Sequence, residues 1–166
     1  MGMLLPDILH RLVPELDQER MKPILEEVLS EENAYVAAHG GVLYPEVEQT
    51  LAALSARCPL FLVSNCQDGY IEAFFQAHGL GRYFTDYENP GRTGLPKADN
   101  IALVAERNGL RRPLYIGDTQ GDYDAASKAG VPFLHAAYGF GRIDRPVPSV
   151  ATFGDLPDAI RRLTPP

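Results

Sequence analysis

The spacing of hydrophobic residues divides the chain into two parts. Residues 7–39 predict helices, because the apolar residues of "PILEEVLSEENAYVAAHG" recur at helical spacing and fall on one face. From Val42 onward, short apolar runs alternate with amphipathic stretches, which indicates strands alternating with helices. We therefore expect a helical segment over residues 1–41 and an α/β domain over residues 42–166.

Residues that favour helix ends refine the bounds of these elements. Asp17 and Asp68 are candidate helix caps, Pro23 suits a first helical turn, and Gly79 is expected to stop a helix. The predicted strands are "PLFLVS", "YFTDY", Pro113 to Ile116, and "VPFLHAA". The predicted helices of the second part are "PEVEQTLAALSAR", "DGYIEAFFQAHG", "KADNIALVAERNG" with its stop at Gly109, Asp122 to Ala129, and Leu156 to Leu163.

Strands and helices alternating at this spacing predict a doubly wound parallel sheet with helices on both faces. Ligands of such sheets bind at the carboxyl ends of the strands. Ser64, Asp86, Asp118 and the loop after Ala137 are expected to arrive at that edge.

Composition and charge narrow the class of partner. The net charge of −7 over 166 residues argues against nucleic acid, which requires a basic face. No apolar run approaches the length that spans a membrane, and the N-terminus does not resemble a signal peptide. Two cysteines, Cys58 and Cys66, do not form a disulfide framework, so a cytoplasmic protein is expected.

The stretch "YIGDTQGDYDAASKAG" carries the strongest candidate chemistry. Asp118 closes a buried strand, where a carboxylate suits Mg²⁺ with water and phosphate as further ligands. A turn aspartate that bonds its own backbone is the alternative. Asp122 could be a second metal-site carboxylate or a helix N-cap, or both. Asp124 falls inside the helix and is expected to be solvated.

Two further positions could bind a phosphate group. Ser64 and Asn65 follow a strand, where the hydroxyl and nearby backbone N–H groups can hold a phosphate oxygen; a plain Ser-Asn turn is the alternative. Lys97 stands just before a helix, where it could neutralise both a phosphate and a buried carboxylate. Cys66 is expected to be a small packing residue, because no histidine lies nearby to activate it.

Taken in order, these residues resemble motifs of the haloacid dehalogenase (HAD) superfamily. "LFLVSN" with Ser64, then Lys97, then "YIGDTQGD" resemble its second, third and fourth motifs, and "LYPEVEQTLAALSARCPLFLVSN" resembles the passage from cap to core in phosphoglycolate-phosphatase-like members. The resemblance implies a Rossmann-like core after the tail of a helical cap, and a Mg²⁺-dependent phosphatase acting on a small phosphorylated metabolite. Ser64 would then bind the phosphoryl group, Lys97 would neutralise it, Asp118 would ligate Mg²⁺, and Asp122 would support the metal site.

The first motif of that family, an apolar strand leading into Asp-x-Asp, has no counterpart before residue 42. Three interpretations stay open: a phosphatase whose first strand lies upstream, a non-catalytic protein that binds a phosphate, a metal or a partner, and a different doubly wound module such as a receiver domain. The family's missing strand would lie between the strands that end at Ser64 and Asp118. Exposed strand edges recruit other strands, so we expect association between chains, as a homodimer or by strand exchange.

Overall fold

The structure is a computed structural model that describes residues 5–163. Its strands are β1 (Leu60–Val63), β2 (Phe84–Glu88), β3 (Tyr115–Gly117), β4 (Phe133–Ala136) and β5 (Ser149–Val150). Its α-helices are α1 (Leu5–Leu12), α2 (Gln18–His39), α3 (Val47–Ser55), α4 (Tyr70–His78), α5 (Pro90–Thr93), α6 (Lys97–Arg107), α7 (Gln120–Lys128) and α8 (Leu156–Leu163). Two 3₁₀ turns cover Leu80–Tyr83 and Phe153–Asp155.

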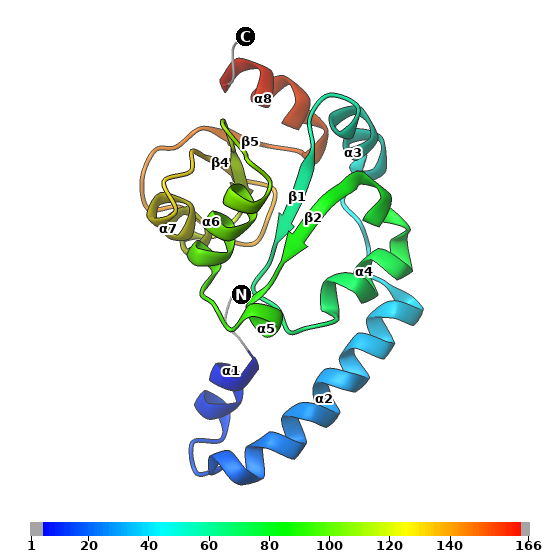
Figure 1. Ribbon diagram of the computed structural model, residues 1–166, viewed down its shortest axis with the longest axis vertical. Coiled ribbons are helices and arrows are strands. Elements are labelled where there is room, and N and C mark those ends of the chain that lie inside the picture. The colour runs from blue at the N-terminus through cyan, green and yellow to red at the C-terminus, as the bar shows by residue number, and fades with distance from the viewer. Residues whose placement is uncertain (1–4, 164–166) are drawn as a thin grey trace.

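The strands form two parallel sheets rather than one. β1 pairs with β2, and β3 pairs with β4, which pairs in turn with β5 (Figure 1). The parallel α/β architecture is as expected. Among the described residues no strand pairing joins β1 to β3, so the expected interruption lies between these two strands.

Helices on both faces hold the two sheets together. On one face, α3 and α8 contribute Leu54 and Leu156 to a cluster that also contains Leu60 of β1 and Ile116 of β3. On the other face, α6 and α7 pack Ile101 and other apolar residues against Val63 of β1 and Tyr115 of β3. The Tyr115 hydroxyl also donates a hydrogen bond of 3.0 Å to the carbonyl oxygen of Val63. Each face therefore has a core that contacts both sheets.

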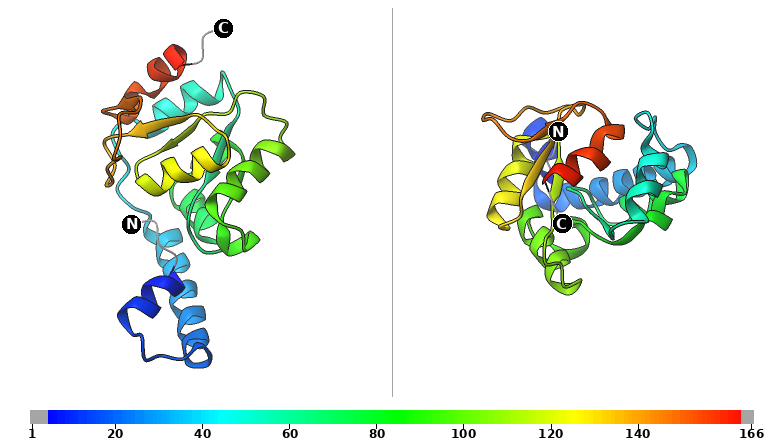
Figure 2. Two further views of the ribbon diagram at one scale, coloured as in Figure 1. Left: turned by 90° about the vertical axis from the view of Figure 1, so that its left-hand side faces the viewer. Right: turned by 90° about the horizontal axis from the view of Figure 1, so that it is seen from above.

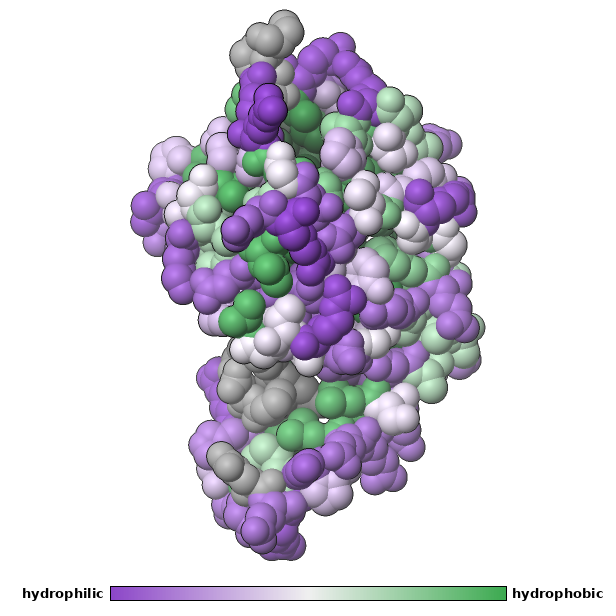
Figure 3. Space-filling model, in the orientation of Figure 1, coloured by the Kyte–Doolittle hydropathy of each residue, from purple (hydrophilic) through white to green (hydrophobic). Residues whose placement is uncertain are grey.

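The helical segment extends away from this core. The carboxyl-terminal part of α2 packs on α4, whereas α1 lies on the other end of α2, below the sheets (Figures 1 and 2). We call α1 and α2 together the arm. Ile24 and Val28 of α2 are 41% and 38% exposed, and hydrophobic residues are visible on the arm in Figure 3. None of the described helices is long and apolar enough to cross a membrane.

Several predicted helix ends are confirmed. Asp17 caps α2 by accepting a hydrogen bond from the backbone N–H of Arg20, and Gly40 and Gly79 end α2 and α4 with positive φ angles of 62° and 64°. Only glycine adopts this conformation without strain. The glycine at 109 follows α6 and has a φ of 60°.

Other predicted ends are wrong. Pro23 lies inside α2, because the Asp17 cap starts that helix earlier. Gly69, not Asp68, is the N-cap of α4, and Asp68 offers its backbone carbonyl to Asn33 instead. The predicted strand "YFTDY" continues to Glu88. Asp86 therefore lies within β2 opposite Phe61 and does not reach the carboxyl edge.

Candidate functional site

The turn after β3 is built around a capping box. Thr119 is the N-cap of α7, and its hydroxyl accepts a hydrogen bond from the backbone N–H of Asp122. The Asp122 carboxylate returns to the backbone N–H of Thr119 at 3.0 Å. Asp122 was weighed as the N-cap itself, and that assignment is wrong by three residues. Asp122 occupies the third helical position, where its carboxylate accepts a hydrogen bond from the backbone N–H of the N-cap residue and so completes the capping box.

Both oxygens of Asp122 are committed to hydrogen bonds. Oδ2 also accepts from the Thr119 hydroxyl at 2.8 Å and from the backbone N–H of Asp118 at 3.2 Å. Oδ1 accepts from Lys97 Nζ at 2.6 Å. Gly117 leaves room for this side chain, since a Cβ at that position would collide with it. Asp122 is thus a structural anchor of the site.

Lys97 is the first residue of α6, and its ammonium group reaches across to α7. Its side chain is 14% exposed and that of Asp122 is 7% exposed, so solvent screens this ion pair only weakly. Burial raises the pKa of Asp122, but the Lys97 charge and the hydrogen bonds from Lys97 and Thr119 outweigh it and lower the pKa below its usual range. The prediction that Lys97 neutralises a buried carboxylate is confirmed.

Asp118 has a different environment, although it is only four residues from Asp122. Its Oδ2 accepts a hydrogen bond of 2.8 Å from the backbone N–H of Phe140, and among the described residues we find no hydrogen bond to Oδ1. The loop after β4 lies so close that a Cβ on Gly139 would collide with the Asp118 side chain. Asp118 is therefore fixed through one oxygen, which leaves the other available to an external ligand.

The free carboxylate oxygen of Asp118 is a suitable ligand for Mg²⁺. Mg²⁺ usually binds one or two carboxylates and keeps several waters, so a single hard oxygen from Asp118 is compatible with it. The described residues contain no group of three or more His, Cys, Asp or Glu side chains that could hold a metal ion. Both oxygens of Asp122 accept hydrogen bonds, and the bond from the Asp118 backbone N–H to Asp122 Oδ2 positions Asp118.

Ser64 follows β1 at the same edge of the fold. Its backbone N–H pairs with the carbonyl oxygen of Glu88. The neighbouring thiol of Cys66 links this loop to Lys97: burial raises its pKa to about 11, and a hydrogen bond with Ser64 and the Lys97 charge offset only part of that rise. Cys66 is protonated and buried, as expected for a packing residue. The charge of Lys97 thus acts on Cys66, which lies two residues after Ser64 in the same loop.

The arm contributes a contact to this loop that the sequence did not predict. Gln67 Nε2 donates to Glu32 Oε2 at 2.6 Å, and Asn33 Nδ2 donates to the carbonyl oxygen of Asp68 at 2.9 Å. Glu32 and Asn33 belong to α2, which the sequence analysis treated only as an amphipathic helix. Helix α2 therefore helps to shape the loop that carries Ser64.

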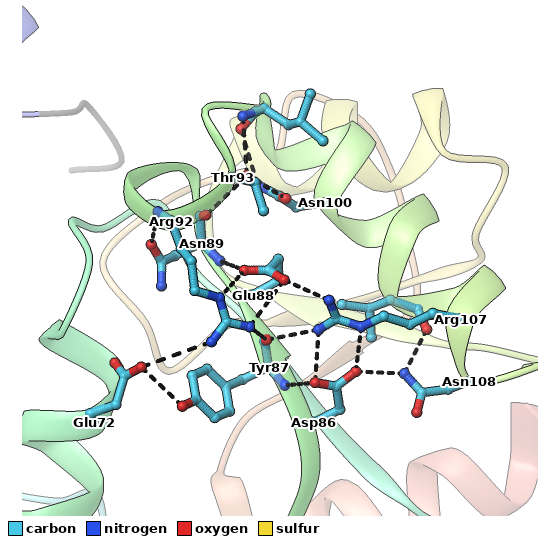
Figure 4. A network of polar contacts seen from close by, with 12 residues as sticks. Glu72, Asp86, Tyr87, Glu88, Asn89, Arg92, Thr93, Asn100, Arg107 and Asn108 are labelled. Carbon is cyan, nitrogen blue, oxygen red and sulfur yellow. Dashed lines mark hydrogen bonds and ion pairs between the residues drawn. The ribbon is translucent and has the colours of Figure 1, made fainter.

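A polar network surrounds the buried Glu88 at the end of β2 (Figure 4). Glu88, at the end of β2, is 2% exposed and pairs with Arg92 at 2.8 Å and with Arg107 at 2.7 Å. Arg107 also binds Asp86 through two hydrogen bonds of 2.7 Å. Burial raises the pKa of Glu88, but the hydrogen bonds from the two arginines outweigh it and lower the pKa.

The same network fixes the turn that leads to Lys97. Asn89 caps the short helix α5 through Arg92 N–H, and Thr93 donates to Asn100 Oδ1 at 2.8 Å. Asn100 in turn donates to the carbonyl oxygen of Leu95. Two separate hydrogen-bonded points thus hold the segment that enters α6 at Lys97. The sequence signal for this network, two acids in the strand followed by two arginines after it, is weak because most such residues are solvated.

Comparison with known proteins identifies the family. The haloacid dehalogenase-like hydrolase family matches residues 1–136. The chain belongs to this family. That result removes the receiver-domain interpretation and confirms the resemblance drawn from the motifs.

Individual relatives agree with this assignment. Over 135 residues the chain is 32% identical to the phosphoglycolate phosphatase of Escherichia coli strain K12, an alignment that covers 76% of this chain and 52% of that protein. The chain thus spans about half the length of the curated relatives it matches.

Solved structures confirm the fold. A haloacid dehalogenase-like hydrolase from Bacteroides fragilis matches with a TM-score of 0.79 at 22% identity, over 94% of this chain and 79% of that one. A predicted phosphoglycolate phosphatase from Haemophilus somnus 129pt matches with a TM-score of 0.72 at 23% identity, over 92% and 72%.

The first testable prediction concerns the polar network. In Arg107→Met the aliphatic packing is kept, but Asp86 and the buried Glu88 lose one cation, so we expect the free energy of unfolding to fall by about 2 kcal/mol. Urea denaturation at pH 7 measures it. Arg82→Met, which breaks an exposed ion pair with Glu48, is the control and should change stability much less. Equal effects of the two substitutions would contradict the role given to the network.

The second prediction concerns the Lys97–Asp122 pair. Because the folded-state pKa of Asp122 is lowered, this carboxylate stabilises the fold above its unfolded pKa of about 4, and the contribution is lost as pH falls through the folded pKa. Lys97→Met removes the cation and leaves a buried carboxylate, so we expect a loss of about 3 kcal/mol at pH 7 that shrinks toward pH 3.

Urea denaturation between pH 3 and pH 7 is the measurement for this pair. Lys128→Met, which removes an exposed partner of Asp99, is the matched control and should give little change at any pH. A loss in Lys97→Met that is the same at pH 3 and pH 7 would show that the ion pair does not stabilise the fold.

Proposed function

We propose that this chain carries the phosphate- and metal-binding part of a HAD-type phosphatase that acts on a small phosphorylated metabolite. The observation that carries the proposal is the meeting of Lys97, Asp118 and the Ser64 loop at the carboxyl ends of β1 and β3, anchored by Asp122. Similarity to phosphoglycolate phosphatase supports a substrate of that class, a compact phosphate monoester with a negative charge.

The proposed roles follow from the contacts. Ser64 and Asn65, with the start of α4, would bind the phosphoryl oxygens, and Lys97 would add a positive charge beside them. Asp118 would ligate Mg²⁺, which supplies charge neutralisation to the phosphate. Asp122 would hold Lys97 and the Asp118 backbone in place. In this proposal, residues 1–41 correspond to the tail of a cap and residues 42–166 to the core.

The attacking group is the part of the reaction that these residues do not supply. Phosphoryl transfer through an enzyme nucleophile needs a carboxylate separate from the metal ligand. In this proposal Asp118 ligates the metal, both oxygens of Asp122 accept hydrogen bonds, and the Cys66 thiol is protonated. We propose that the nucleophile belongs to the family's first motif, on a strand beyond the sequence described. A non-catalytic protein that binds a phosphate, a metal or a partner is the second candidate, supported by the hydrogen bonds to both oxygens of Asp122, which leave this carboxylate poorly suited to act as a nucleophile.

Metal binding provides the third prediction. We expect weak Mg²⁺ binding by isothermal titration calorimetry, and at least a tenfold loss of affinity in Asp118→Asn, because that change removes the hard anionic oxygen. Asp124→Asn is the matched control, since Asp124 lies exposed on α7, the helix that follows Asp118, and accepts a hydrogen bond from Gln120. Equal affinity of Asp118→Asn and the unmodified chain would refute the site.

The fourth prediction concerns turnover. The 166-residue chain should hydrolyse a generic aryl phosphate with Mg²⁺ no faster than the buffer control, because neither Lys97 nor the metal provides an attacking group. A continuous colorimetric assay of highly purified protein is the measurement. Activity that persists through purification and disappears in Asp118→Ala would mean that the nucleophile lies within this chain.

A further inference from the structure

Helix α2 carries a polar side chain within its least exposed stripe. The apolar members of that stripe follow one another at helical spacing and are buried or half-buried: Met21, Leu25, Leu29 and Val36. Asn33 takes the position between Leu29 and Val36 and is half-buried as well. An apolar residue is expected there, because asparagine is a poorer helix former and adds no apolar packing. The position therefore indicates a role for the amide itself.

The amide of Asn33 holds the turn that precedes α4. Its Nδ2 donates to the carbonyl oxygen of Asp68 at 2.9 Å, and its Oδ1 accepts a longer hydrogen bond of 3.5 Å from Gln67 Nε2. Gly69, the N-cap of α4, has a φ of 83°, and a Cβ at this position would lie 2.7 Å from Asn33 Nδ2. Glycine therefore meets two requirements here, a left-handed backbone and the close approach of α2.

Three different elements fix alternate residues of the loop after β1. The backbone N–H of Ser64 is bonded to β2 and the carbonyl oxygen of Cys66 to α5, each at 3.2 Å. The carbonyl oxygen of Asp68 is bonded to Asn33 of α2. The first two bonds join backbone groups of the core, whereas the third comes from a side chain of the arm. A single substitution in the arm can thus release the turn and leave the other two bonds in place.

We propose that Asn33 is a positioning residue for phosphate binding: by fixing the turn at Asp68, it sets the affinity of the loop after β1 for a phosphate group. The inference rests on the proposed function, which assigns the phosphate to Ser64, Asn65 and the start of α4. A loop that is ordered before its ligand arrives loses less conformational freedom on binding and therefore binds more tightly. Asn33 does not touch the phosphate in this proposal and acts only through the turn.

The hydrogen bond from Asn33 contributes more to the position of the turn than to the stability of the fold. Asp68 is exposed, so water can bond its carbonyl oxygen when the amide is removed. Leucine has nearly the shape of asparagine, is a better helix former and would continue the apolar stripe of α2. Asn33→Leu is therefore expected to keep the stability of the chain while it frees the turn. A purely structural residue would show the opposite pattern.

Titration with inorganic phosphate tests the proposal. Backbone amide NMR spectra of the full 166-residue chain, at fixed Mg²⁺ concentration and ionic strength, give the dissociation constant from the signals of Ser64 and Tyr70. We expect Asn33→Leu to weaken phosphate binding about fivefold, the equivalent of one hydrogen bond, with an unchanged midpoint of urea denaturation. Ala34→Leu adds the same side chain at an exposed neighbouring position of α2 and should change neither quantity.

Two results of this titration would overturn the proposal. One is equal phosphate affinity in Asn33→Leu and the unmodified chain. The other is a loss of affinity in Asn33→Leu together with a matching loss of stability, because the residue would then act only on the fold. If Asn33→Leu does not fold, Asn33→Ala takes its place, since alanine favours the helix and removes the same donor.

Amide hydrogen exchange needs no ligand and separates this inference from the proposed function. Without phosphate, the amides of Tyr70 and Gly91, which donate to carbonyl oxygens of the loop, should exchange about fivefold faster in Asn33→Leu. The amide of Gly79, at the other end of α4, should exchange at an unchanged rate. Unaltered exchange of Tyr70 and Gly91 would overturn the positioning role. Absence of phosphate binding by the unmodified chain would instead refute the proposed function, and with it the effect of Asn33 on phosphate, whatever the exchange rates show.

Discussion

The rest of the structure depends on how β1 and β3 are held side by side, because no backbone pairing joins these two strands among the described residues. A parallel sheet normally transmits its register through continuous hydrogen-bonded ladders, and here one ladder ends at β1 and the other at β3. The sheets keep their relative position through side chains: two apolar clusters, one on each face, and the bond from Tyr115 to Val63. Apolar contacts are less directional than hydrogen bonds. The carboxyl edge, where the candidate site lies, is thus positioned by packing more than by pairing.

This arrangement explains why the ion pair between Lys97 and Asp122 matters beyond its own energy. Lys97 begins α6, which packs against β1 and β2, whereas Asp122 lies in α7, which packs against β3 and β4. The pair therefore joins elements that belong to different sheets, at the edge where the ladder is missing. Near the same edge, α2 bonds the loop after β1, and the Glu88–Arg107 network fixes the turn before α6. Polar contacts among side chains replace part of what a central strand would provide.

The sequence predicted the parts of this fold that follow from periodicity. Continuous apolar runs predict buried parallel strands, and glycines after amphipathic stretches predict helix ends, so β1, β3, β4, α2 and α8 are found near their expected bounds. The two-residue strand β5 was not predicted, since so short a stretch carries no period. Asp68 and Asp122 were weighed as caps because both precede apolar helical stretches. In the structure Gly69 is the N-cap of α4 and Thr119 is the N-cap of α7.

The candidate site shows the same division between local and tertiary information. The predicted parallel sheet placed Ser64 and Asp118 at one edge, because parallel strands bring their carboxyl ends together, and the resemblance to the HAD motifs added Lys97 to them. Asp86 was expected there as well, but the strand runs two residues further and Arg107, 21 residues later, captures the carboxylate. No local sequence pattern indicates a partner that lies so far along the chain. Glu88 and Asn33 were missed for the same reason, since each acquires its role only through a contact made by the fold.

Asp118 and Asp122 illustrate how the fold gives one residue type two roles. Both carboxylates follow the same strand, yet from the residues that the structure describes Asp122 accepts four hydrogen bonds and Asp118 accepts one. A fully bonded carboxylate has little left to offer a ligand, and removing it leaves several donors without a partner. A carboxylate held through one oxygen can bind a cation with little change to the fold. Substitution of Asp122 should therefore act mainly on stability and substitution of Asp118 mainly on binding, and that separation is the physical basis for the proposal that Asp118 ligates Mg²⁺.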